Sequence, residues 1–139
     1  MADQNRTIVE GFWHDLYRGD LAAAAARFDA QGEYTDVTTP EDDVARGPEE
    51  IVRRLTLAFG KLSGLRDERR QLVASADTVM TEHIEHWAWP TGETMALPVA
   101  SVHELRGRRI VRWCDYWDMN TLVEAAPTWW FEHVMQGWK

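Results

Sequence analysis

The hydrophobic pattern of this chain changes once, near Gly64, and the change limits the folds that the chain can adopt. Before Gly64, apolar residues recur every three or four positions, as on amphipathic helices, over about 7–17, 21–28 and 47–59. After it, apolar and polar residues alternate over 68–76, 78–89, 93–105 and 110–119. Turn residues separate these strands at hairpin distances. We therefore predict an α+β fold, with N-terminal helices packed on one side of a curved, mainly antiparallel sheet.

The chain has 139 residues, which is enough for one core and too few for two of ordinary size, so we predict a single domain over 1–139. A short strand-like run at 33–36 precedes an acidic loop, and Asn120 should cap a short helix at 121–126. The segment 127–139 is an aromatic tail that is too apolar to remain in water. We expect it to cover a cavity mouth or a partner subunit.

The balance of charge excludes several classes of partner. A formal net charge of -8 and a pI near 5 disfavour binding to nucleic acid or to an anionic membrane surface. No apolar run approaches the length of a membrane span, and the first residues lack the apolar core of a signal peptide, so we expect a cytoplasmic protein. The single cysteine, Cys114, forms no internal disulfide and cannot by itself build a thiolate metal site.

One carboxylate interrupts a row of residues suited to burial. In the strand 110–119 every second side chain is large and apolar (Val111, Trp113, Trp117 and Met119) except Asp115. A buried carboxylate must be hydrogen-bonded, be paired with a cation, or have a raised pKa. Asp115 is therefore either a structural residue that holds a neighbouring backbone or Arg, or a catalytic one, and this strand alone leaves both possibilities open.

A second group of ionisable residues lies on the strand 78–89. His83 and Glu85 are two residues apart, so they project to the same face as Trp87. If this face and that of Asp115 both line the concave side of the sheet, the three residues meet in an apolar hollow, where carboxylate pKa values can separate into an acid and a base. The alternative for His83 and Glu85 is exposure on an edge strand. Together with Asp36 these residues are possible metal ligands, but their spacing matches no metal signature, and we predict neither metal nor cofactor.

The order of elements resembles the cone-shaped fold shared by nuclear transport factor 2, ketosteroid isomerase, scytalone dehydratase and the SnoaL-type polyketide cyclases. The resemblance covers roughly 8–126. It is best in the last two strands, 96–102 and 109–119, where Arg-Trp-Cys-Asp-Tyr-Trp-Asp is similar to the Trp-Arg-Asp-Tyr-Phe-Asp run of limonene-1,2-epoxide hydrolases. The resemblance implies an apolar cavity enclosed by the cone, an apolar small-molecule substrate, and a homodimer.

The resemblance also assigns roles to single residues. Asp115 matches the carboxylate that takes a proton from the attacking water, Tyr34 matches the tyrosine that helps to hold this water, and Asp36 stands where the family has Asn. Glu85 matches the general acid, and His83 replaces an Arg that bridges both carboxylates. We therefore expect three carboxylates in a site without a permanent cation, so that at least one is protonated or paired with His83.

The leading hypothesis is an epoxide hydrolase that opens an apolar epoxide by acid and base catalysis, with an aromatic wall formed by Trp87, Trp113 and Trp117. A SnoaL-like cyclase, isomerase or dehydratase is the alternative enzyme, and the replacement of Arg by His83 favours it. A third possibility is a binding or dimerisation module in which Asp115 is only structural.

Overall fold

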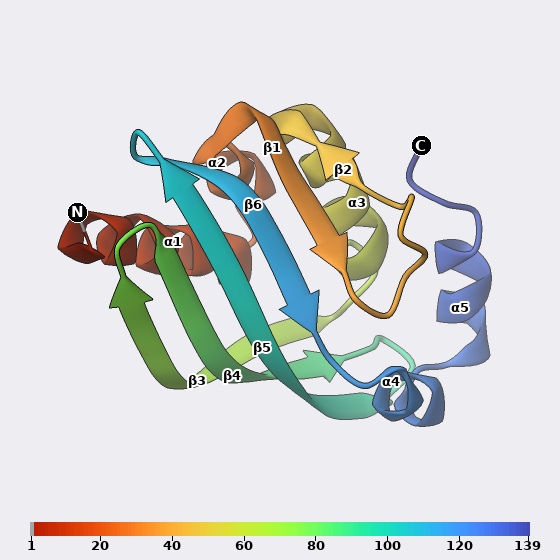
Figure 1. Cartoon of the computed structure of the whole chain (residues 1–139). Coiled ribbons are helices and arrows are strands. Elements are labelled where there is room, and N and C mark those ends of the chain that lie inside the picture. Colours follow the sequence, from red (N-terminus) through yellow and green to blue (C-terminus); the bar gives the residue numbers. More distant parts are fainter. Residues whose placement is uncertain (1) are drawn as a thin grey trace.

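The structure, a computed structural model, describes residues 2–139 (Figure 1). Its elements, in chain order, are α1 (Ala2–Tyr17), α2 (Leu21–Ala25), β1 (Phe28–Asp36), β2 (Ala45–Arg46), α3 (Gly47–Phe59), β3 (Gly64–Ser75), β4 (Thr78–Ala88), β5 (Thr94–Arg106), β6 (Arg109–Tyr116), α4 (Met119–Ala125) and α5 (Thr128–Val134).

The strands form one curled sheet in the order β2-β1-β6-β5-β4-β3. Every neighbouring pair is antiparallel except β1 and β6, which run parallel. Helices α1, α2 and α3 lie together against one face of this sheet, and α4 and α5 close one end of it (Figure 1). The predicted α+β fold and its meander β3 to β6 are thus confirmed, whereas the pattern had indicated only a short strand in the region of β1.

Several boundaries differ from the predicted ones. Helix α1 begins at Ala2, a full turn earlier than predicted, and the second helix ends at Ala25. Phe28 opens β1 instead, because its ring packs into the core between helices and sheet. The last strand ends at Tyr116, and the cap of α4 is Asp118 rather than Asn120: the Asp118 carboxylate accepts a hydrogen bond from the backbone N–H of Asn120.

A bulge changes which residues of β6 face the core. Leu105 pairs with Ile110 and Glu104 pairs with Arg112, so Val111 is the extra residue on its strand. Ile110 is fully buried in the core, while Val111 is only half-buried. The predicted place of Val111 in the buried row is therefore wrong.

Two apolar clusters flank the interior. One lies between the first three helices and the sheet, and includes Phe12, Ile51 and Trp113. The other lies at the end closed by α4 and α5, and includes Trp87, Trp89, Leu122 and Trp130. Trp130 is buried against its own chain, and its Nε1 donates a hydrogen bond to the Ala58 carbonyl at 3.2 Å. Within residues 2–139, no helix combines the length and the apolarity needed to cross a membrane.

Candidate functional site

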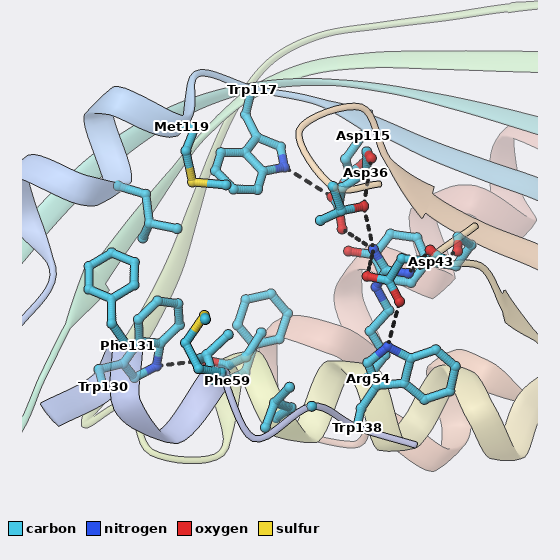
Figure 2. Close-up of a pocket in the computed structure, with 18 of the residues that line it drawn as sticks. Asp36, Asp43, Arg54, Phe59, Asp115, Trp117, Met119, Trp130, Phe131 and Trp138 are labelled. Carbon is cyan, nitrogen blue, oxygen red and sulfur yellow. Dashed lines mark hydrogen bonds and ion pairs between the residues drawn. The ribbon is translucent and has the colours of Figure 1, made fainter. Parts of the chain in front are cut away.

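A cavity of about 600 Å³ opens between the two clusters, and its wall is mostly apolar (Figure 2). The sheet contributes its inner face, α3 one side, and α4, α5 and the C-terminal residues another. The apolar wall includes Phe59, Trp87, Leu97, Val99, Trp117, Met119 and Phe131. Among the polar residues that reach this cavity are Tyr34, Asp36, Arg54, Glu85 and Asp115.

Asp115 is held by only one of its two carboxylate oxygens. The Ser101 hydroxyl, directly opposite on β5, and the Trp113 indole N–H each donate to Oδ1 at 2.6 Å. The other oxygen, Oδ2, accepts no hydrogen bond from any of residues 2–139. Burial, and then the charge of Asp36, raise the pKa of the Asp115 carboxyl well above its usual range, although Ser101 and Trp113 oppose the shift. The residue therefore combines a fixed orientation with one oxygen left for a ligand or water.

Glu85 reaches the same cavity from β4 with a different set of partners. The Tyr17 hydroxyl donates to its Oε2 at 2.6 Å, and the Trp87 indole N–H donates to its Oε1 at 3.1 Å. Burial raises the pKa of Glu85, and the hydrogen bond from Tyr17 partly opposes the shift. Strand β4 lies between β3 and β5, so exposure on an edge strand is excluded for Glu85 and for His83.

His83 does not line the cavity but lies behind it, fully enclosed. Its Nε2 lies 3.1 Å from the Ser101 hydroxyl, which contacts Asp115. Its Nδ1 lies 3.1 Å from the hydroxyl of Tyr17, which contacts Glu85. The imidazole is thus connected to both carboxylates through one hydroxyl each, where a bridging Arg would touch them directly.

The expectation that the site lacks a permanent cation is wrong, because Arg54 of α3 supplies one (Figure 2). The Arg54 guanidinium lies 3.0 Å from Asp36 Oδ2, stacks 4.7 Å from the centre of the Tyr34 ring and also contacts Asp43. The other oxygen of Asp36 accepts a hydrogen bond from the Trp117 indole at 3.0 Å. Asp36 and Asp115 are neighbours across β1 and β6. The positive charge of the guanidinium therefore offsets the negative charge of one of two adjacent carboxylates.

The three tryptophans predicted as an aromatic wall have different places. Trp87 and Trp117 line the cavity. Trp113 does not line it, contrary to the prediction, because its ring is buried in the core and stacks on Tyr34 with 3.8 Å between ring centres. Trp113 contributes to the site through its indole N–H, which donates a hydrogen bond to Oδ1 of Asp115.

Sequence reasoning missed Arg54, Tyr17 and Ser101. Arg54 and Tyr17 lie on helices whose patterns indicate only which residues pack in a core. Ser101 could have been found only from the register of β5 against β6, which places it opposite Asp115.

The aromatic tail closes one side of the cavity within the same chain. The Trp138 indole N–H donates to the Asp43 carboxylate at 3.0 Å, and the residues around it line the cavity (Figure 2). Among residues 2–139, no three His, Cys, Asp or Glu side chains are grouped so that they could hold a metal ion.

Comparison with known proteins gives a family and a set of similar folds. The family model described as a SnoaL-like domain matches residues 9–113. An LEH-like epoxide hydrolase from M. tuberculosis is 20% identical, with a TM-score of 0.73 over 98% of this chain and 92% of that chain. A putative SnoaL-like polyketide cyclase from Jannaschia sp. is 14% identical, with a TM-score of 0.79 over 91% and 94%. An NTF2-like protein from Burkholderia thailandensis is 25% identical, with a TM-score of 0.74 over 88% and 98%. No protein with a curated description matches the sequence.

Proposed function

The chain belongs to the SnoaL-like family, and on that premise we propose that it is a cofactor-free epoxide hydrolase that acts on an apolar small molecule. The observation that carries the proposal is that two buried carboxyl groups, Asp115 and Glu85, lie in the wall of one apolar cavity, each held in a fixed orientation by two hydrogen-bond donors. Burial raises the pKa of both carboxyls, and the charge of Glu85 adds to the rise at Asp115, so the two groups do not ionise together. When Glu85 holds the shared proton, Asp115 can act as the base and Glu85 as the acid.

In the proposed reaction, Oδ2 of Asp115 takes a proton from water as the water oxygen attacks a carbon of the epoxide. The hydroxyl of Tyr34 and the Asp36 carboxylate, which Arg54 holds in place, help to position this water. The carbon–oxygen bond breaks, and Glu85 gives its proton to the departing oxygen. The product is a vicinal diol, with Asp115 protonated and Glu85 ionised, and no covalent intermediate forms.

The cavity wall indicates the class of substrate. Aromatic and aliphatic side chains make up most of the surface, and its polar residues besides the carboxyl groups and Arg54 include Thr39, Gln136 and Lys139. The guanidinium of Arg54 is already occupied by Asp36 and Asp43. An uncharged, largely apolar epoxide fits these conditions, whereas an anionic substrate would have to compete for Arg54.

One observation favours a second candidate, a cyclase, isomerase or dehydratase that moves a proton next to a carbonyl group. Oδ1 of Asp115 is connected through Ser101 to His83, so an imidazole rather than an Arg supports the carboxylate on the side away from the free Oδ2. Such an enzyme needs only one residue that removes and returns a proton, and adds no water to its substrate.

The experiment that separates these candidates is hydrolysis of a panel of cyclic and terpene epoxides in 18O-labelled water. The proposal predicts a diol that carries one labelled oxygen, and its loss in Glu85→Gln. The matched control is Glu82→Gln, because Glu82 lies on the same strand but is exposed on the outer face. Proton exchange at a carbonyl substrate, without labelled diol from any epoxide, would favour the second candidate instead.

A further inference from the structure

A second hollow lies on the other side of His83, away from the cavity, and is open to solvent. It is bordered by α1 and β3, and among its residues are Tyr17 and Asp67, with Glu10 and Arg69 forming an ion pair at 3.0 Å beside them. The Asp67 side chain is 21% exposed there, and its Oδ1 lies 3.0 Å from Nδ1 of His83. His83 thus stands between the solvent-facing hollow and the two buried carboxyl groups.

The hydrogen bonds fix which nitrogen of His83 can exchange a proton. The Ser101 hydroxyl gives its only hydrogen to Asp115 Oδ1, so it can only accept from His83. Nε2 must therefore carry a hydrogen, and Nδ1 is the nitrogen whose proton can be lost and regained. Nδ1 has two partners, Asp67 Oδ1 at 3.0 Å and the hydroxyl of Tyr17 at 3.1 Å.

Tyr17 completes the connection to Glu85. Its hydroxyl donates to Glu85 Oε2 at 2.6 Å while a lone pair faces Nδ1 of His83. Burial and the charge of Glu85 raise the pKa of the Tyr17 hydroxyl well above its usual range. A phenol that holds its proton so firmly can pass one on only by receiving another at the same time.

We propose that Asp67, His83 and Tyr17 form a proton path that reprotonates Glu85 from the solvent in the second hollow. The inference rests on the proposed function, in which Glu85 loses a proton in each turnover. The side chains in hydrogen-bond or ring contact with His83 include Tyr17 and Trp13 from α1, Asp67 from β3 and Ser101 from β5. The ionisable groups Glu85 and His103 are also close enough to interact with it through their charges. Of the four contacting side chains, only Asp67 carries a carboxylate, and its Oδ1 accepts the hydrogen of Nδ1 when the ring is protonated there.

The protons balance in each turnover. The Tyr17 hydroxyl gives its proton to Glu85, His83 Nδ1 gives its own to the Tyr17 oxygen, and solvent at Asp67 restores the proton of Nδ1. A half-turn of the Glu85 carboxyl group about Cγ–Cδ then presents its proton to the cavity. Asp115 releases the proton that it took from the attacking water to water in the main cavity, so one proton enters and one leaves.

The test compares a single turnover, measured with enzyme in excess, with steady-state turnover of an epoxide that the native protein hydrolyses. Asp67→Ala leaves Glu85 protonated before the first turnover and slows only its recovery. We therefore expect a first turnover close to the native rate, followed by steady-state turnover slowed by about tenfold or more. Formate, small enough to occupy the space of the missing carboxylate, should restore steady-state turnover in a saturable manner.

The matched control is Glu68→Ala, which removes a carboxylate 3.1 Å from another histidine, His86, on the same pair of strands but on its exposed side. Glu68→Ala should change neither the rate of the first turnover nor that of steady-state turnover. Asp67→Asn serves as a variant of nearly unchanged volume. Equal slowing of the first and later turnovers in both Asp67 variants would show a structural role and overturn the proton path, as would native kinetics in both.

A measurement without substrate separates this inference from the proposed function. The 15N chemical shifts of the His83 ring at alkaline pH should show the tautomer with hydrogen on Nε2, and hydrogen on Nδ1 would overturn the path. If the native protein hydrolyses no epoxide, the proposed function falls and the path falls with it. If it hydrolyses epoxides and Asp67→Ala shows no burst, only the path falls.

Discussion

His103 should make the stability of this protein depend on pH in mildly acidic solution. The ring is completely buried between α1 and the sheet. Its Nδ1–H donates to the Val79 carbonyl at 2.9 Å, and its Nε2 accepts from the Trp13 indole N–H at 3.1 Å. A neutral imidazole satisfies both contacts, whereas a protonated one would point an N–H at an N–H. Burial lowers the pKa of His103 from 6.5 to about 4, although the hydrogen bond to Val79 opposes the shift.

The sign and size of the effect follow from this difference. Above pH 6.5, His103 is neutral in both the folded and the unfolded chain, and its contribution to stability is complete. As the pH falls below 6.5, the unfolded chain binds a proton that the folded protein does not, so the free energy of unfolding decreases until about pH 4. The full loss is about 3 kcal/mol, of which about 2 kcal/mol is reached by pH 5.

The assay is urea denaturation of the native protein and of His103→Gln between pH 7.5 and pH 5. Gln keeps one donor and one acceptor but does not titrate, so the stability advantage of the native protein over the variant should shrink by about 2 kcal/mol. Comparing the two proteins cancels the titration of groups that they share. His14→Gln, an exposed histidine on α1, is the control and should leave the pH dependence unchanged. An advantage that stays constant over this range would refute the reasoning.

Two further predictions concern the contacts behind the site. Arg54→Met leaves the Asp36 carboxylate buried without its cation, so it should lower the free energy of unfolding in urea by about 3 kcal/mol. The control is Arg53→Met, at an exposed position one residue earlier, which should lower it by well under 1 kcal/mol, as is usual for a surface ion pair. Equal losses in the two variants would contradict the role assigned to Arg54. Trp113→Phe removes one of the two hydrogen-bond donors to Asp115, which raises the pKa of that carboxyl further. The acidic limb of the pH–rate profile should therefore move to higher pH. If it does not move, this limb does not report the ionisation of Asp115.

Local patterns were sufficient to predict the main parts of the fold. Strict alternation placed Glu85 and Trp87 on one face of β4, and a single carboxylate in an apolar row singled out Asp115. These inferences succeeded because side-chain direction in a strand is set by the backbone alone. The bulge at Val111 broke the same rule, since an extra residue reverses the alternation and leaves no mark in the hydrophobic pattern.

The contacts that complete the site depend on how distant elements meet. Arg54 reaches Asp36 only because α3 packs beside β1, and Ser101 reaches Asp115 only through the register of β5 and β6. The parallel pairing of β1 with β6 places Asp36 beside Asp115, which lies 79 residues later in the chain. No periodicity within one segment carries this information.

The most direct test of the proposed chemistry is the turnover of Asp115→Asn on an epoxide that the native protein hydrolyses. Asn keeps an oxygen that can accept from Ser101 and Trp113, so the fold and the cavity should be preserved, but it cannot take a proton from water. We expect kcat to fall by about 100-fold or more, with affinity for an apolar cavity ligand and stability in urea nearly unchanged. Turnover close to that of the native protein would contradict the assignment of Asp115 as the general base and leave it as a structural residue.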